Sequence, residues 1–330
     1  MFLKKLLSQK LILTVSALIL VILCLYPFLV LFGKITFPAP LFEFDLKYYF
    51  KVFESKSTLL ALKNTVFISL GTAMVSTILA LPLSWVLTRT NLANAGKWRS
   101  LFCLPYAIPP YIGAMAWIYL ANPTNGLLNI ILGKGFLNIY SQLGLMWVMS
   151  CFFYTFILLS LLASLDRMDP SLEEAARISG ASPFKVFTQI TIPIIFPSLL
   201  SGILLVVLAA SASFGVPALI GNPARIYLIT TRIYTFQKMG SMGGIYMAGS
   251  LSALLIVLAI FILLLNQRLL RKGHFKTVGG KTSRPSLIDL GSYKTPLTIL
   301  LGMMFFLLFG LPFFGILVTA LSKVQGELSF

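Results

Sequence analysis

The stretch that decides the fold covers residues 164–193 and reads SLDRMDPSLEEAARISGASPFKVFTQITIP. It separates two long apolar runs, yet it holds four of the chain's nine acidic residues. Within it, Ser171 stands three residues before Glu174, a spacing typical of a capping box at the start of a helix. Pro170, directly before that serine, also suits a helix start. The stretch therefore predicts a short polar helix beginning at about residue 171.

The same stretch predicts a bend and a second helix. Glu173 and Arg177 are four residues apart and would pair on one helical face. Gly180 predicts the end of the first helix, because glycine readily adopts the left-handed conformation found there. Ser182 followed by Pro183 predicts the cap and first turn of a second helix, which continues into the next apolar run.

Composition places the rest of the chain in a membrane. Apolar residues make up 58% of the 330 residues and charged residues only 11%, whereas a soluble domain has about 25% charged residues. A spanning helix needs roughly 20 apolar residues. Seven runs qualify, at about 11–33, 65–88, 100–121, 143–164, 192–213, 243–266 and 296–321. We expect an all-α polytopic membrane protein with about seven transmembrane helices, the third broken at Pro105, Pro109 and Pro110.

The distribution of lysine and arginine predicts the orientation. With the N-terminus in the cytoplasm, the inside segments would carry 16 of the 26 basic residues. These segments are 1–10, 89–99, 165–191 and 267–295. Cytoplasmic loops are enriched in basic residues, so the pattern favours an inside N-terminus. The net charge of +17 therefore reflects membrane topology and does not indicate a nucleic-acid partner.

The stretch also resembles a known family. The pattern E-A-A-x3-G-x9-I-x-L-P marks the EAA loop of binding-protein-dependent ABC transporter permeases, and only Ile192 departs from it. The matching residues are Glu174, Ala175, Ala176, Gly180, Ile190 and Pro193. Runs two to six, over residues 60–266, are arranged like the five-helix core of these MetI-like permeases.

The resemblance implies a function. The loop would dock a cytoplasmic ABC ATPase, and that partner, not this chain, would hydrolyse ATP, so the chain itself would be no enzyme. An extracytoplasmic solute-binding protein would deliver the solute to a bacterial inner membrane. One chain offers one such loop, so a second permease half is implied: a homodimer, a heterodimer or a missing C-terminal half. The docking residues would be Glu173, Glu174, Ala175, Ala176, Arg177, Gly180, Ile190 and Pro193.

Four segments are expected along the chain. Residues 1–60 would form an anchor helix with an external interfacial segment, and residues 61–266 the permease domain with its EAA loop at 165–193. Residues 267–295 would form a cytoplasmic linker and residues 296–330 the first span of an incomplete second repeat. The linker resembles that of double-length iron(III)-type permeases, so the chain looks like the N-terminal half of one plus one span. This favours iron(III) as solute, with aminophosphonates, polyamines or another small solute as alternatives.

Other functions fit the sequence less well. Ion-coupled secondary transporters and channels commonly keep ionisable residues inside the membrane, and the central parts of the seven runs contain none. Residues 278–282, VGGKT, resemble the end of a phosphate-binding loop, but Phe275 stands where its first glycine is required. His274 is the only histidine, and the three cysteines have no CxxC spacing, so no metal site or other cofactor is expected.

A translocation path is expected near the end of the fifth run. Small residues gather there and permit close helix contact, and two serines among them could face a solute. The candidate path residues are Ser211, Ser213, Phe214, Gly215 and Pro217.

Overall fold

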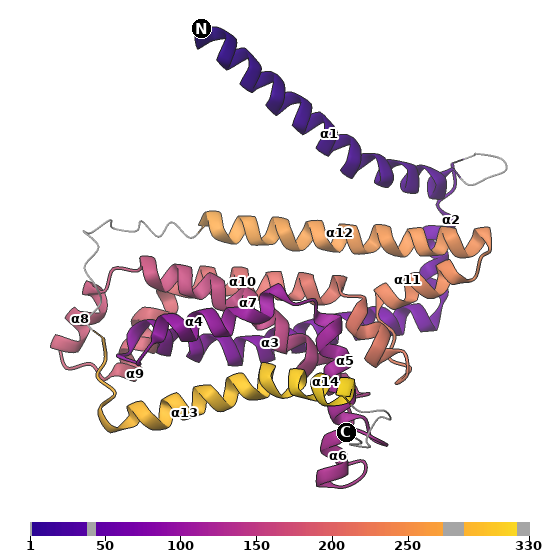
Figure 1. Cartoon of the computed structure of the whole chain (residues 1–330). Coiled ribbons are helices and arrows are strands. Elements are labelled where there is room, and N and C mark those ends of the chain that lie inside the picture. The colour runs from indigo at the N-terminus through magenta and orange to yellow at the C-terminus, as the bar shows by residue number, and fades with distance from the viewer. Residues whose placement is uncertain (1, 38–43, 273–286, 322–330) are drawn as a thin grey trace. The chain divides into compact units, whose positions relative to one another are not determined.

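The chain is helical throughout most of its described length (Figure 1). The computed structural model describes residues 2–37, 44–272 and 287–321. Within these ranges, extended pairing is confined to one isolated bridge between Thr90 and Ile288. Residues 278–282, with the VGGKT sequence, lie outside the described residues. The predicted all-α fold is confirmed.

Fourteen α-helices follow one another in the described ranges, with short 3₁₀ and π-helical turns between them. The α-helices are α1 (Phe2–Thr36), α2 (Lys47–Glu54), α3 (Lys56–Arg89), α4 (Ala95–Cys103), α5 (Pro110–Ala121), α6 (Leu127–Leu132), α7 (Gln142–Arg167), α8 (Ser171–Ile178), α9 (Pro183–Val186), α10 (Ile192–Ala212), α11 (Ile229–Lys238), α12 (Met242–Lys272), α13 (Lys294–Phe305) and α14 (Leu311–Leu321). The turns are η1 (Leu104–Ala107), η2 (Phe187–Thr191), η3 (Pro217–Gly221), η4 (Gly291–Tyr293) and η5 (Phe306–Gly310).

Seven stretches of the described chain are long and apolar enough to cross a membrane if the bent pair counts as one span. Six are continuous: Leu11–Thr36, Lys56–Arg89, Gln142–Arg167, Pro183–Ala212, Met242–Leu270 and Gly291–Val318. The seventh is the pair Ala95–Ala107 and Pro110–Ala121, which is bent by 95°. Proline lacks the N–H that would continue the helical ladder, so the break falls at Pro109 and Pro110, as the sequence predicted. Pro105, the third proline of that prediction, lies in η1, before the break.

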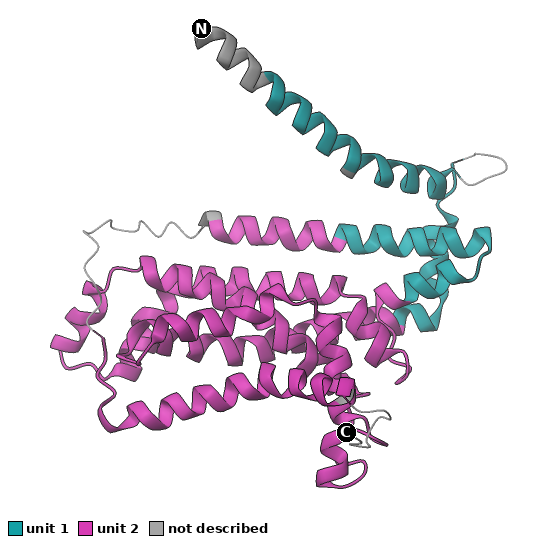
Figure 2. Cartoon of the chain, viewed as in Figure 1, with its two compact units in different colours: residues 1–59, 232–257 teal, residues 60–231, 258–330 magenta. Residues whose placement is uncertain are grey.

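Two compact units make up the chain (Figure 2). The first comprises Met1–Leu59 and Arg232–Val257. In it, Ile35 at the end of α1 is buried against α12, and a Cβ atom on Gly249 would lie 2.5 Å from its Cδ1 atom. The rings of Tyr48 in α2 and Tyr246 in α12 lie 4.8 Å apart. The predicted external segment thus contains a short helix that packs within this unit.

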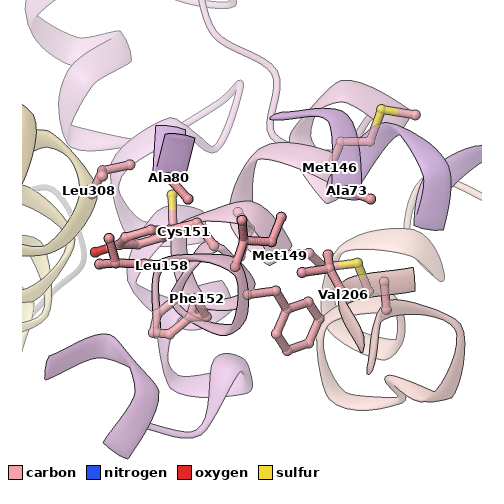
Figure 3. Close-up of a cluster of buried hydrophobic side chains, with 14 of the residues drawn as sticks. Ala73, Ala80, Met146, Met149, Cys151, Phe152, Leu158, Val206 and Leu308 are labelled. Carbon is pink, nitrogen blue, oxygen red and sulfur yellow. The ribbon is translucent and has the colours of Figure 1, made fainter. Parts of the chain in front are cut away.

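The second unit, Leu60–Thr231 and Leu258–Phe330, is built around α7. Figure 3 shows Cys151, Phe152 and Leu158 of this helix among the apolar side chains of its neighbours. A Cβ atom on Gly202 of α10 would lie 2.9 Å from the Cα atom of Ile157, so the two helices meet almost backbone to backbone. Small residues permit such close approach inside membranes.

The last span also packs into the second unit. The ring of Phe305 in α13 meets that of Phe102 in α4 edge to face, with centroids 5.8 Å apart. Gly315 in α14 lies against Leu120 of α5. A Cβ atom added to Gly315 would lie 2.9 Å from the Cδ2 atom of Leu120. The segment expected to begin a second repeat therefore packs against the same helices that form the core of this unit.

Candidate functional site

Helix α8 begins differently from the predicted capping box. Its N-cap is Pro170, and no side chain bonds the cap position. Instead, the Oδ1 atom of Asp169 accepts a hydrogen bond from the backbone N–H of Ser171 at 2.9 Å. This bond lowers the pKa of the Asp169 carboxyl below its usual value. The capping box was wrong because an acceptor two residues earlier in the chain already satisfies the first free N–H.

The predicted bend at Gly180 is confirmed in detail. Its φ is +86°, in the left-handed region. The N–H of Ala181 bonds the carbonyl of Ala176, and the N–H of Gly180 bonds that of Arg177, both at 3.0 Å. This pair of bonds is the Schellman arrangement, which satisfies carbonyls left free at a helix end.

The second helix of the loop is continuous with a membrane span. Ser182 caps α9 by accepting a hydrogen bond from the N–H of Lys185 at 3.3 Å, and Pro183 occupies its first turn. The chain then passes through the π-helical turn η2 into α10, so that Pro183–Ala212 counts as one span. Pro193 follows this wide turn; lacking an N–H, it cannot extend a regular helical ladder there.

Glu173 lies inside the protein instead of on the loop surface. Only 2% of its side chain is exposed, and its Oε2 atom lies 2.7 Å from the Nε atom of Arg89. Thr191 donates a hydrogen bond from Oγ1 to the Oε1 atom of Glu173 at 2.6 Å. Arg177, the predicted i,i+4 partner, lies 4.0 Å away. The strongest partner of Glu173 is therefore distant in sequence.

We call Arg89, Glu173 and Thr191 the buried cluster. Arg89 is also 2% exposed, and its Nη2 atom donates to the carbonyl of Leu165, at the end of α7, at 3.1 Å. Its own carbonyl accepts from the N–H of Ile288 at 2.9 Å. The sequence pattern did not predict this cluster. The one sequence feature that marks the cluster is Arg89, because it is the first basic residue after a long apolar run.

Other residues of the loop remain on its surface. Ala175 is exposed, whereas Glu174, Ala176 and Arg177 are half-buried. Ile190 is partly buried against the core, and Pro193 is exposed. The three large apolar side chains Leu172, Ile178 and Phe184 are 52%, 88% and 76% exposed. We call these three the exposed apolar residues of the loop. Phe187, a turn further on, instead packs against Trp85.

The candidate path residues fall into two groups. Ser211 is 3% exposed and donates to the carbonyl of Leu208, and Pro217 is buried, so both belong to the interior of the unit. Phe214 is 42% exposed and Ser213 is half-buried. Gly215 lies close to α5, since an added Cβ would be 2.8 Å from the Cβ atom of Tyr111. The turn after α10 thus meets the broken third span.

No group of three His, Cys, Asp or Glu side chains within the described ranges has the spacing to hold a metal ion. Cys103 and Cys151 are free thiols.

Comparisons with known proteins agree on one family. The model of the family described as "Binding-protein-dependent transport system inner membrane component" matches residues 92–272. A probable sulfate transport system permease protein of Chlorella vulgaris is 25% identical over 61% of this chain and 75% of its own length. The ferric transport system permease protein FbpB of Actinobacillus pleuropneumoniae is 25% identical over 77% of this chain but only 37% of its own length.

A solved structure shares the fold. A bacterial ABC transporter involved in alginate import aligns with a TM-score of 0.65 and 20% identity, covering 83% of this chain and 100% of that one. The family match spans more than half of the chain and includes α8, α9 and α10. The chain therefore belongs to the family of binding-protein-dependent transport system inner membrane components, the MetI-like permeases of ABC transporters.

Proposed function

We propose that this chain is the permease subunit of an ATP-driven importer whose α8–α9 loop docks a cytoplasmic ABC ATPase. An extracytoplasmic binding protein would deliver the solute, and a second permease half would complete the pathway. The observation that carries the proposal is the form of the loop. The loop consists of the helix α8, which ends at Gly180, and the helix α9, which is capped by Ser182 and continues into the membrane span Pro183–Ala212.

The exposed side chains of the loop support a protein partner. Ile178 is 88% exposed and Phe184 is 76% exposed on a segment between two spans. Burying one such side chain is worth roughly 1.5–3 kcal/mol. Exposed apolar side chains grouped on one segment are typical of interaction sites. We therefore assign the contact to the exposed apolar residues of the loop together with Glu174, Ala175, Ala176 and Arg177.

The remaining residues expected at the docking site take positioning roles. Gly180 sets the bend between the two helices. Ile190 lies in η2 and Pro193 in the first turn of α10, where the second helix of the loop continues into the span. Glu173 is too deeply buried to reach a partner. Docking of an ATPase on this loop also requires the N-terminus to be cytoplasmic, in line with the count of basic residues.

The solute path is proposed at the break of the third span. Irregular backbone at membrane depth is tolerated only where protein or a water-filled cavity surrounds it. Tyr106 and Tyr111, on either side of the break, are 58% and 48% exposed. Phe214 and Gly215 adjoin Tyr111 from the turn after α10. These exposed rings would line the path, with Ser213 beside them.

Iron(III) is the proposed solute. The linker resembles that of iron(III)-type permeases, and the ferric permease FbpB aligns over 77% of this chain. Sulfate is the second candidate because of the Chlorella vulgaris relative. Proteoliposomes holding the purified transporter and its binding protein would be offered ⁵⁵Fe(III)-citrate or ³⁵S-sulfate. Uptake without an ATPase or ATP would instead indicate a secondary transporter or channel.

Co-purification tests the docking proposal. The chain would be co-expressed with candidate ABC ATPase subunits, as wild type and as Glu174→Arg, Gly180→Pro and Ile178→Glu. Each variant should retain at least tenfold less ATPase than wild type. Phe136→Glu is the matched control, because this side chain is 70% exposed in the loop between α6 and α7. If Glu174→Arg and Gly180→Pro both retain as much ATPase as wild type, the docking assignment fails.

A further inference from the structure

The buried cluster has no part in the docking contact described above. Arg89 and Glu173 are both 2% exposed, so neither side chain can meet a partner subunit. Charged side chains are almost never fully buried unless they are paired, and moving the two charges out of water is costly. Apolar side chains of similar size could fill the same space. The pair therefore calls for a role beyond filling the interior.

Three membrane elements meet the docking helix at this cluster. Glu173 extends from α8, and its two carboxylate oxygens have different partners. One oxygen lies 2.7 Å from Arg89 at the last residue of α3. The other accepts a 2.6 Å hydrogen bond from Thr191 at the end of η2, where α10 begins. Through the 3.1 Å bond to the carbonyl of Leu165, Arg89 extends the connection to α7.

The covalent route from α8 to α10 is less direct. It passes through Gly180, which ends α8 with a φ of +86°. The space beside Gly180 is open: a Cβ atom added there would have no heavy atom within 4 Å. The route then passes through the single turn of α9. Open space and a glycine permit rotation at this point. The buried cluster bypasses it, because Glu173 lies before the bend and Thr191 lies after it.

Directional contacts can transmit a displacement that a sliding apolar contact would absorb. The bonds from Thr191 to Glu173 and from Arg89 to the Leu165 carbonyl are charge-assisted hydrogen bonds, which depend on geometry and are stronger in a low-dielectric interior. Arg89 and Glu173 themselves meet as a 2.7 Å ion pair outside hydrogen-bond geometry. The π-helical form of η2 also places the Thr191 hydroxyl within reach of Glu173, and such turns are frequent at functional sites.

We infer that the buried cluster transmits movement of the docking helix α8 to the cytoplasmic ends of α3 and α7 and to the start of α10. The inference rests on the proposed docking function and goes beyond it. Movement of the ATPase would reach three spans through the carboxylate of Glu173, in addition to the covalent connection through α9. Glu173, Arg89 and Thr191 are thus positioning residues, and the expected loss in their variants is a loss of coupling.

Hydrogen exchange on the intact transporter tests this. The complex with its ATPase subunits would be compared without nucleotide and after trapping with MgATP and vanadate. In wild type, amide exchange should change at least threefold at residues 84–91 and 187–192 as well as in α8. In the double variant Arg89→Met with Glu173→Met, the change should persist in α8 but fall below 1.5-fold at 84–91. The double variant avoids an uncompensated buried charge, so its thermal stability should match wild type.

Two further variants make the test decisive. Asp166→Asn is the matched control: it removes the 2.9 Å pair with Arg99, which also links α7 to another helix but is 32% and 48% exposed. This control should leave the exchange pattern unchanged. Thr191→Val keeps the ion pair and should lower the change only at 187–192, which provides a test even if the double variant does not accumulate.

The outcomes separate the two proposals. A double variant that binds the ATPase and keeps the full nucleotide-dependent change at residues 84–91 would overturn the inference. A nucleotide-dependent change in amide exchange at residues 187–192 that is the same in Thr191→Val as in wild type would overturn the proposed connection to α10. A wild-type chain that retains no ATPase would contradict the docking function itself, before any variant is compared.

Discussion

Replacing Glu173 by glutamine should destabilise the protein far more than a loop substitution normally does. Glutamine has nearly the same shape, and its Oε1 atom can still accept the 2.6 Å hydrogen bond from Thr191. The change therefore removes mainly the charge that faces Arg89 at 2.7 Å. Arg89 is 2% exposed, so its guanidinium would stay charged and unpaired inside the protein.

The expected cost follows from that burial. Removing one partner of a buried ion pair costs about 3–5 kcal/mol, whereas an exposed pair is worth roughly 0.2–1 kcal/mol. At roughly 2 °C per kcal/mol for a unit of this size, Glu173→Gln should lower the unfolding temperature by about 6–10 °C. Asp166→Asn, whose pair with Arg99 is 32% and 48% exposed, should lower it by no more than about 2 °C.

The assay is thermal unfolding of the detergent-purified chain, followed by intrinsic tryptophan fluorescence at two salt concentrations. Salt screens exposed charges but reaches buried ones much less. The difference between wild type and Glu173→Gln should therefore be the same at both concentrations. Equal shifts for Glu173→Gln and Asp166→Asn would refute the view that Glu173 is held in a buried ion pair.

Three further predictions concern other features. Gly180→Ala should cost about 1–2 kcal/mol, because its φ of +86° disfavours any side chain, and the loss should appear in thermal unfolding. Gly202→Ala should cost about 1–3 kcal/mol by the same measurement, because the added Cβ would lie 2.9 Å from the Cα of Ile157. The Asp169 carboxyl, held ionised by the N–H of Ser171, should titrate in the folded protein below the usual 3.9. Its contribution to the start of α8 should be present above that pH and be lost as the pH falls through the lowered pKa; NMR titration of the carboxyl carbon measures this.

Matched controls accompany these changes. An alanine at Gly96 meets no heavy atom within 4 Å and requires no positive φ, so Gly96→Ala should leave the unfolding temperature unchanged or raise it slightly. Asp169→Asn keeps the acceptor oxygen but removes the titration. A folded-state pKa of 3.9 or higher for Asp169 would contradict the hydrogen bond to Ser171.

Local chemistry made much of the fold predictable. Apolar runs of spanning length gave the seven membrane segments, and Pro109 and Pro110 gave the break in the third. Gly180 and Ser182 marked the bend and the second helix of the loop correctly. In each case the decisive groups are neighbours in the chain, so spacing alone carries the information.

The errors have a common cause. Ser171 and Glu174 fit a capping box, but Asp169 competes for the same N–H, and spacing cannot rank two acceptors. Glu173 was expected among the docking residues of the loop, paired with Arg177. Its burial depends on Arg89, 84 positions earlier, and on a π-helical turn that brings Thr191 within reach. Contacts of that kind arise only when distant helices pack together.

Site-specific photo-crosslinking tests the docking of the ATPase most directly. Benzoylphenylalanine would replace Ile178, which is 88% exposed on the loop, or Phe136, which is 70% exposed between α6 and α7. After illumination of membranes that contain the chain and its ATPase subunits, position 178 should give a covalent adduct with the ATPase, and position 136 should give none. No adduct at position 178, or equal adducts at both positions, would contradict the assignment of this loop as the docking site.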